Sequence, residues 1–336
     1  MGPELIRQAR VGIVGCGLIG QKRSKALGGA RVVACCDKEV ERAQGLARSS
    51  AAAVCGDWRD LVKRDDVDIV IVATTNEVLA PIALGATENR KHVLVEKPAA
   101  RSVAELRPLV EGAKQQGVRV RVGFNHRYHP ALRKAHEMVA SGEIGDLMFV
   151  RGRYGHGGRV GYEKEWRSDP KLSGGGELID QGVHLIDLAR WFLGSFVQVQ
   201  GFAQTFFWDM PVDDNGFLLL RTQDRRAAML HVSCTEWKNM FSFEIYGRTG
   251  KLHVEGLGGS YGIERLSYYR MLPEMGPPET TIWEYPRGDE SWALEFREFL
   301  DDIRLDREPS ASLHDAIGAL EIVERIYKES GFDHLA

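Results

Sequence analysis

The stretch Val11-Gly12-Ile13-Val14-Gly15-Cys16-Gly17-Leu18-Ile19-Gly20 decides the fold of this 336-residue chain. Its apolar start predicts a buried strand, and the G-x-G-x-x-G pattern that follows predicts a tight turn into a helix. The first glycine permits the turn, the second lets backbone N–H groups approach a pyrophosphate, and the third lets helix and strand pack closely. The pattern alone is weakly specific, and its place between strand and helix is what indicates a dinucleotide site. The predicted cofactor contacts are Gly15, Gly17, Leu18, Ile19 and Gly20.

An acidic residue follows at the end of the second predicted strand, at the distance of about 20 positions that ribose recognition requires. Asp37 comes directly after the apolar run at residues 32–36. A carboxylate there accepts hydrogen bonds from the ribose hydroxyls of NAD and repels the extra phosphate of NADP. Lys38 and Arg42 lie close enough in sequence to soften this repulsion. The sequence therefore favours NAD over NADP, with Lys38 as a further contact.

Strand and helix signals alternate over residues 10–124. Short apolar runs predict strands at residues 10–14, 31–36, 51–55, 68–73, 92–95 and 118–124. Stretches typical of helices lie between most of them, at residues 18–27, 40–49, 78–89 and 103–116. Continuous apolar strands joined by helices imply a parallel sheet covered on both faces, and six of them fit a doubly wound fold. We therefore predict an α/β Rossmann domain over residues 1–124.

The pattern changes after residue 125, where a second domain is expected over residues 125–336. It begins with a helix at 129–140, a strand at 147–154 and a long apolar helix at about 177–193. Strand signals then follow one another at residues 197–207, 217–222, 227–235, 241–247, 251–255, 265–270 and 281–285. Two helices, at 292–305 and 313–327, close the chain. Such a succession of strands predicts a largely antiparallel sheet in an α+β domain.

Composition excludes several classes of protein. The formal net charge is −3 and there is no basic tract, so a nucleic-acid or anionic-membrane partner is not expected. No apolar run approaches the ~20 residues that a membrane helix needs. The five cysteines are odd in number and form no C-x-x-C, which argues against a disulfide framework or a zinc site. We expect a reduced, cytoplasmic enzyme without a metal.

A lysine lies at the end of the fifth predicted strand, in the run Glu96-Lys97-Pro98. Ligands of open α/β sheets bind beyond the carboxyl ends of the strands. The ammonium of Lys97 would hydrogen-bond a substrate hydroxyl there and favour the alkoxide as it forms. Without this position, an exposed loop lysine would be the default interpretation.

The long apolar helix carries a polar stripe. Asp180, His184 and Asp187 stand at i, i+4 and i+7, which places them on one helical face within about 60° of one another. Oxidation of an alcohol needs a proton acceptor, and histidine suits that role near neutral pH. Asp180 would orient the imidazole of His184. The alternative is a capped, hydrogen-bonded core cluster or a helix rim that faces solvent. This alternative suits Asp187 best, with Arg190 or a loop amide as its partner.

Taken together, these motifs resemble the glucose–fructose oxidoreductase / inositol dehydrogenase (Gfo/Idh/MocA) family. Their order and spacing agree along nearly the whole chain. The matching features are the glycine turn, Asp37, Glu96-Lys97-Pro98, Gly123-Phe124-Asn125-His126-Arg127, and Gly174-Gly175-Gly176 leading to Asp180, His184 and Asp187.

The resemblance implies a Rossmann domain, a C-terminal α+β domain with a large open sheet, and homodimers or homotetramers formed through that sheet. It also implies that Lys97, Asp180 and His184 are catalytic and that Glu96 and Lys97 contact the cofactor. One segment departs from the family pattern. Thr-Pro-Asn-x-x-His is replaced by Thr74-Thr75-Asn76-Glu77-Val78-Leu79, which keeps Thr74 and Asn76 as cofactor contacts but lacks the proline and the histidine.

Substrate contacts are expected from Lys97, Asp180 and His184 and from residues around the glycine-rich segment. Aromatic side chains would stack on a sugar ring, and arginines would bind phosphate or carboxylate. The candidates are Arg127, Tyr154, His156, Tyr162, Trp166 and Arg167, each with ordinary loop packing as its alternative. The sequence does not decide whether Trp208, Trp237 and Asn239 line the substrate cleft or a subunit interface.

Three functions remain open from the sequence. The first is an NAD-dependent dehydrogenase that acts on a secondary alcohol of a sugar, sugar nucleotide or cyclitol, at ring C3 for example. The second is an NAD-dependent glycosidase or lyase that oxidises C3 transiently and shows no net NADH. The third is a non-catalytic nucleotide-binding regulator, which the presence of both Lys97 and His184 disfavours.

Overall fold

The computed structural model describes residues 9–332, which divide into two compact units. The first unit contains the residues up to Phe124 together with Trp292–Ile317. The second contains Asn125–Ser291 and the residues from Gly318 onward. The change of unit after Phe124 coincides with the boundary predicted from the sequence, whereas the placement of Trp292–Ile317 differs from it.

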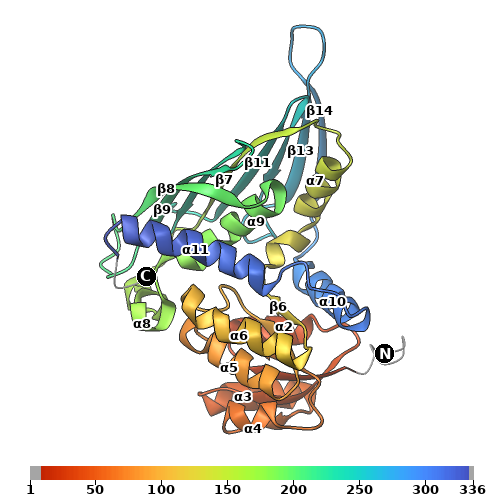
Figure 1. The fold of residues 1–336 in the computed structure, drawn as a ribbon, viewed down its shortest axis with the longest axis vertical. Helices are drawn as coiled ribbons and strands as arrows, with labels where there is room; N and C mark the ends of the chain where they lie inside the picture. The colour runs from red at the N-terminus through yellow and green to blue at the C-terminus, as the bar shows by residue number, and fades with distance from the viewer. Residues whose placement is uncertain (1–8, 333–336) are drawn as a thin grey trace. The chain divides into compact units, whose positions relative to one another are not determined.

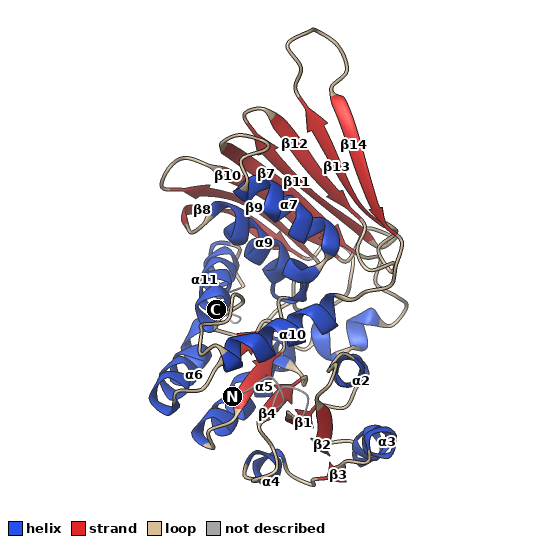
Figure 2. Ribbon diagram, turned by 90° about the vertical axis from the view of Figure 1, so that its right-hand side faces the viewer, coloured by secondary structure: helices blue, strands red, loops and turns tan. Residues whose placement is uncertain are grey.

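The first unit is built on a six-stranded parallel sheet in the order β3-β2-β1-β4-β5-β6 (Figure 2). This is the strand order of dinucleotide-binding folds. The central strand β4 is buried along its whole length, as expected for a strand covered on both faces. The strands are β1 (Arg10–Val14), β2 (Arg31–Cys36), β3 (Ala53–Val54), β4 (Ile69–Val72), β5 (His92–Val95) and β6 (Val120–Val122).

Two helices of this unit, α4 and α6, begin at residues whose side chains cap the helix. In α6, the Ser102 side chain accepts a hydrogen bond from the N–H of Glu105, and Gly117 ends the helix with left-handed backbone. A short helix capped by Asp57 was not predicted from the sequence. The helices are α2 (Leu18–Lys25), α3 (Val40–Ser50), α4 (Trp58–Val62), α5 (Asn76–Glu88), α6 (Val103–Gln116) and α10 (Ser291–Arg304).

Helix α10 belongs with the nucleotide-binding sheet, which corrects the predicted second domain over residues 125–336. Phe296, Phe299 and Leu300 are buried in one apolar cluster with Val11 and Ile13 of β1. The same helix pairs its acidic face with a buried arginine, since Asp302 and Glu298 both contact Arg121 of β6. Apolar burial and charge pairing together hold this late segment on the first unit.

The second unit contains an eight-stranded sheet in the order β14-β13-β12-β11-β7-β10-β9-β8 (Figure 1). Every neighbouring pair is antiparallel except β7 and β10, which confirms the predicted, mostly antiparallel sheet. The strands are β7 (Leu147–Gly155), β8 (Phe196–Gln204), β9 (Asn215–Thr222), β10 (Ala227–Ser233), β11 (Met240–Gly247), β12 (Gly250–Glu255), β13 (Glu264–Arg270) and β14 (Glu279–Tyr285).

Helices cover one face of this sheet and leave the other face open (Figures 1 and 2). Along β9, for example, Leu218 and Leu220 are buried and Leu219 is 52% exposed, because side chains alternate between the two faces. The helices are α7 (Pro130–Ala140), α8 (Pro170–Ser173), α9 (Val183–Leu193) and α11 (Leu313–Glu329), with a π-helical turn at Leu178–Gly182 and 3-10 turns at Asn125–Tyr128, Tyr162–Lys164 and Trp166–Ser168.

Within residues 9–332, no helix combines the length and apolar character that a membrane span requires.

We predict that Phe299→Ala lowers the free energy of unfolding of the first unit by about 3–5 kcal/mol, because it empties a fully buried ring position. Hydrogen exchange of the β1 and β4 amides and urea denaturation measure this loss. The control Arg297→Ala, on the exposed side of α10, is expected to change stability by less than about 0.5 kcal/mol. Faster exchange confined to the strands of the second unit would contradict the assignment of α10.

Candidate active site

The glycine turn of the first unit has a backbone that only glycine tolerates. Gly15 has a φ of +94°, and a Cβ there would lie 2.3 Å from the carbonyl oxygen of Ala73. Its N–H donates to the carbonyl of Cys36 over 2.9 Å, which ties the turn to β2. A Cβ at Gly20 would lie 1.9 Å from the carbonyl oxygen of Gly15. The predicted roles of both glycines, a tight turn and close helix packing, match this geometry.

The turn presents the N-terminus of α2 as a cradle for a phosphate group. Gly17 is the residue before the helix, and a Cβ there would meet no atom within 4 Å. Leu18, the first helical residue, is 72% exposed, and Ile19 is half-buried. The first N–H groups of a helix have no partner within it, and its dipole favours an anion. These residues therefore fit the pyrophosphate of NAD.

Asp37 lies beside this turn with both carboxylate oxygens engaged by the backbone. One oxygen accepts from the N–H of Cys16 over 2.6 Å, and the other accepts from the N–H of Glu39 over 2.9 Å. A carboxylate offers about four acceptor positions, so capacity for the ribose hydroxyls of NAD remains. Asp37 thus supports the glycine turn as well as standing where the ribose acceptor is predicted.

The remaining predicted cofactor contacts of this unit lie at strand ends or at the start of a helix. Lys38 is exposed directly after Asp37, and Lys97 is half-buried two residues after the end of β5. Thr74 follows β4, and its hydroxyl donates to the carbonyl of Thr75 over 3.2 Å. Asn76 is the buried first residue of α5.

Glu96 was predicted as a cofactor contact, and its carboxylate is engaged by Arg23 of α2. Arg23 Nε donates to Glu96 Oε1 over 2.6 Å, and the same guanidinium forms an ion pair with Glu295 of α10. Burial raises the pKa of Glu295, and Arg23 counteracts this effect. Gly123 leaves room for the same guanidinium, because a Cβ at this position would lie only 2.7 Å from Arg23 Nη2. The cluster anchors the residue that precedes Lys97, and the sequence analysis did not identify Arg23 or Glu295.

The helix with the predicted polar stripe begins as a π-helical turn, Leu178–Gly182, and continues as α9. This differs from the uniform α-helix assumed in the sequence analysis. A π-turn is wider than an α-turn and frequently marks a functional site. Gly182 packs this turn closely on the sheet, since a Cβ there would lie 3.2 Å from Val232 Cγ1 of β10. The side chains of Asp180 and His184 are buried beside this turn, 7% and 4% exposed.

A buried carboxylate fixes the start of this helix. Asp213 accepts hydrogen bonds from the N–H of Gly176 over 2.9 Å and from the N–H of Leu178 over 2.7 Å. The hydroxyl of Tyr327 donates to the same carboxylate over 2.7 Å. Burial raises the pKa of Asp213 to about 6. The sequence analysis did not identify this helix cap, because Asp213 lies in a distant loop.

His184 is stacked on a second histidine. The ring of His126 lies 3.8 Å from that of His184, centroid to centroid, at an interplanar angle of 19°. Tyr154 approaches both rings edge-on, with centroids 5.2 Å from His126 and 6.3 Å from His184. His126 belongs to the motif at residues 123–127, but the sequence provided no reason to place it against His184.

Asp180 is paired with Arg167. Arg167 Nε donates to Asp180 Oδ2 over 2.8 Å, and the attraction of this carboxylate raises the pKa of the guanidinium. The Trp166 ring lies beneath the guanidinium at 4.7 Å. Arg167 and Asp180, both predicted as substrate contacts, are thus brought together, and the orienting bond to His184 stays a prediction.

A histidine–carboxylate pair, His156 with Glu177, lies near Asp180. Nε2 of His156 lies 3.5 Å from Glu177 Oε2, and Glu177 is fully buried. Burial opposes the charge on His156, but the interactions with Glu177 outweigh it, so the pKa of the imidazole is raised above 6.5. Tyr162 packs edge-on against His156 at 5.5 Å. The sequence analysis did not identify Glu177.

Arg127 forms a buried ion pair with Asp187, and its substrate contact stays a prediction. Its Nε donates to Asp187 Oδ2 over 2.8 Å, and the two side chains are 5% and 1% exposed. Asp187 therefore has the structural role foreseen for it, with Arg127 in place of Arg190 as its partner. Arg190 lies against Gly318, where a Cβ would be 2.2 Å from the guanidinium carbon.

Among residues 9–332, no group of three or more His, Cys, Asp or Glu side chains is arranged to hold a metal ion.

Comparison with known proteins connects both units to one family of enzymes. The family model described as an oxidoreductase family with an NAD-binding Rossmann fold matches residues 9–124. The model described as the GFO/IDH/MocA C-terminal domain matches residues 132–253. An inositol 2-dehydrogenase of Rubrobacter xylanophilus is 36% identical over 259 residues, 74% of this chain and 72% of that protein. A levoglucosan dehydrogenase of Pseudarthrobacter phenanthrenivorans is 29% identical over 226 residues, 63% of this chain but only 58% of that protein.

Solved structures share the fold along nearly the whole chain. Levoglucosan dehydrogenase in complex with NADH matches with a TM-score of 0.86 at 24% identity, over 96% of this chain and 98% of that one. GenD2 from gentamicin A biosynthesis, in complex with NAD, matches with a TM-score of 0.82 at 25% identity, over 96% and 94%. The fold class and the NAD-binding domain predicted from the sequence are confirmed.

We predict that His156 titrates above pH 6.5 and that Glu177→Gln lowers its pKa, as measured by NMR of the imidazole carbons. Because the folded-state pKa is raised, the pair stabilises the protein fully below pH 6.5, and this contribution is lost as the pH rises through the folded-state pKa. His231, whose pKa burial lowers, is the internal control and is expected to titrate below 6.5 in both proteins. An unchanged His156 pKa in the variant would contradict the pairing.

Proposed function

Because the chain belongs to the GFO/IDH/MocA family of NAD-binding oxidoreductases, we propose that it oxidises a secondary alcohol of a neutral sugar or cyclitol. The observation that carries this proposal is the buried histidine stack. His184 is held against His126 on a helix whose start is fixed by Asp213, and Asp180 lies four residues earlier in the same segment. A buried imidazole whose ring is held by stacking is suited to accept a hydroxyl proton.

Each side chain has a proposed role in proton transfer. His184 takes the hydroxyl proton, and its stack on His126 limits rotation of the ring. Asp180 stabilises the imidazolium that forms, and the hydrogen bond from Arg167 holds this carboxylate in place. Lys97, held at the end of β5, favours the alkoxide. NAD, when bound at the glycine turn, supplies the hydride acceptor.

The balance of charge around His184 favours a neutral substrate. Arg127 pairs with Asp187, Arg167 pairs with Asp180, and His156 pairs with Glu177. A phosphate would have to compete with these carboxylates for the guanidinium groups. The hydroxyls of a polyol need donors and acceptors without net charge, and paired groups of this kind supply them. The aromatic rings of Tyr154 and Trp166 suit the C–H face of a sugar ring.

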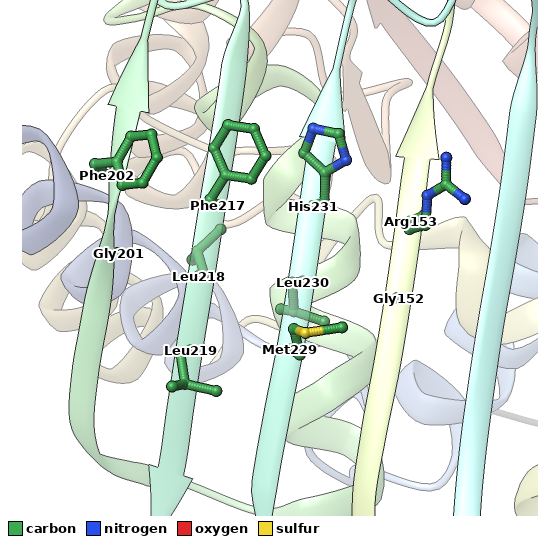
Figure 3. Close-up of a pocket in the computed structure, with 10 residues that line it drawn as sticks. All are labelled: Gly152, Arg153, Gly201, Phe202, Phe217, Leu218, Leu219, Met229, Leu230 and His231. Atoms are coloured by element: carbon green, nitrogen blue, oxygen red, sulfur yellow. The ribbon is translucent and has the colours of Figure 1, made fainter.

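The open face of the large sheet is the proposed contact between copies of this chain. Figure 3 looks onto this face, with helices behind the sheet. Rings of Phe202 and Phe217 lie 5.0 Å apart beside Leu219 and Met229, which are each 52% exposed. They line an open hollow of about 480 Å³. Apolar side chains gathered in such a patch are typical of a subunit interface, and a second copy would bury this outer-face patch.

A reducing compartment, the cytoplasm, is proposed for this enzyme. All five cysteines are free thiols, and four of them are buried. Free thiols in such number persist where glutathione keeps cysteine reduced.

We predict that the purified protein forms NADH with at least one member of a panel of inositols, free sugars and nucleotide sugars. His184→Ala is expected to lower kcat about 100-fold or more, because general-base catalysis contributes roughly 10²–10⁴-fold. NAD affinity, measured by calorimetry, is expected to stay within about two-fold, since His184 lies outside the nucleotide-binding unit. Full activity of the variant would eliminate His184 as the base. Bond cleavage without net NADH would instead identify a glycosidase or lyase.

We predict that the wild-type protein is oligomeric by light scattering and that Met229→Asp shifts it toward the monomer, because a charge would be buried in the outer-face patch. Met275→Asp is the matched control, since Met275 is fully exposed in the loop before β14. An oligomer that persists in Met229→Asp would place the interface elsewhere.

A further inference from the structure

Aromatic rings continue outward from the candidate active site in an unbroken series. The Tyr162 ring lies 5.5 Å from His156 and 5.4 Å from Trp208. Phe207 then packs edge-on against Trp208 at 5.1 Å and against Trp237 at 4.8 Å. The series, which we call the aromatic track, begins at the pair of His156 with Glu177 and ends at the surface.

The outer end of the aromatic track is exposed although its rings are large. Phe207 is 56% exposed and Trp237 is 67% exposed. Single exposed apolar residues are common on proteins, but two aromatic rings in contact, joined to an active site, form a surface that a ligand ring can cover.

Hydrogen bonds to one buried carboxylate hold the loop that carries Phe207 in place. The N–H groups of Phe206, Phe207 and Trp208 all donate to the carboxylate of Asp214, over 2.9, 2.7 and 3.1 Å. Asp214 is completely buried. The indole N–H of Trp208 donates to the carbonyl of Cys234 over 3.0 Å. A ring fixed in this way loses little conformational freedom when a ligand binds.

Trp237 is held by strained backbone. Its φ is +57°, in the left-handed region that is unfavourable for a non-glycine residue. Gly157 packs against it so closely that a Cβ would lie 2.9 Å from Trp237 Cα. Strain of this kind is retained where the surroundings impose it, and it gathers at ligand clamps and active sites. The neighbouring N–H of Glu236 donates to the carbonyl of His156 over 3.0 Å, which joins this loop directly to the site.

We propose that Phe207 and Trp237 form a subsite for a second ring of the substrate, so that the enzyme acts on glycosides in which the oxidised ring carries another sugar. The inference rests on the proposed function, because it assumes that the first ring binds beside His184. The second pyranose would place its apolar C–H face on the indole of Trp237. Its hydroxyls would remain at the polar rim, where Lys238 and Asp209 are exposed.

Neighbouring side chains separate this subsite from the proposed subunit contact. Phe206 points to the outer-face patch, with its ring 6.5 Å from that of Phe217. Phe207, the next residue, contacts Trp208 and Trp237 of the aromatic track. Phe206→Ala is therefore a matched control for Phe207→Ala, since both remove an exposed phenylalanine ring from the same turn.

The first measurement is ligand binding by saturation-transfer NMR on the NADH-loaded protein, with cellobiose, maltose and melibiose as probes. We expect transfer to both rings of at least one disaccharide. Trp237→Ala and Phe207→Ala are expected to remove the transfer to one ring only, and Phe206→Ala is expected to leave both. Absence of transfer to any disaccharide, or equal loss from both rings, overturns the subsite.

The second measurement compares kcat/KM for each disaccharide with that for its parent monosaccharide. We expect Trp237→Ala to lower kcat/KM for the disaccharide about ten-fold, equivalent to about 1.4 kcal/mol, and to leave the monosaccharide within about two-fold. Equal loss for both overturns the subsite, as does a change of oligomeric state in Trp237→Ala. If no probe is oxidised while the two-ring NMR contact is present, the proposed oxidation fails and the subsite stands.

Discussion

Three buried carboxylates at the candidate active site are stabilised because each of them meets a cationic partner from another part of the chain. Removing an ion from water costs several kcal/mol, and a lone buried charge would unfold the helix that carries it. Asp187 is paired with Arg127, Asp180 with Arg167, and Glu177 with His156. Each pair ties the helix at Leu178–Leu193 to a segment that precedes it in the chain. These three pairs fix the segment that carries His184, and the candidate active site depends on them.

The nucleotide-binding unit obeys the same constraint with different residues. Arg23 lies fully buried behind the glycine turn, and its charge is met by Glu96 and Glu295. Because Glu295 comes from α10, a helix some 270 residues later in the chain than Arg23 completes the cluster that holds Glu96, the residue before Lys97. The first unit is therefore built from two separate segments of the chain, although all the strands of its sheet come from the first segment.

The predictions succeeded where a local pattern has one physical solution. Gly15 and Gly20 occupy the turn that the G-x-G-x-x-G spacing requires, because a Cβ at either position would clash with the backbone, and Asp37 accepts a hydrogen bond from this turn. They did not extend to side chains whose partners are distant in the chain. Nothing in the local sequence indicated that Arg127 would pair with Asp187. The sequence pattern also could not predict the π-turn at Leu178–Gly182, because the period of a π-helix differs from that of an α-helix by less than one residue per turn.

The sequence by itself determined the strand–turn–helix start, the alternation that specifies a parallel sheet, the succession of strands that specifies an antiparallel one, and the family. All of these depend on interactions between residues close in the chain or on their periodicity. Tertiary structure alone decided that His126 stacks on His184, that α10 joins the first unit, and that Asp214 holds Phe207 beside Trp237. These arrangements depend on contacts across many residues, which burial and charge pairing select only once the whole chain is folded.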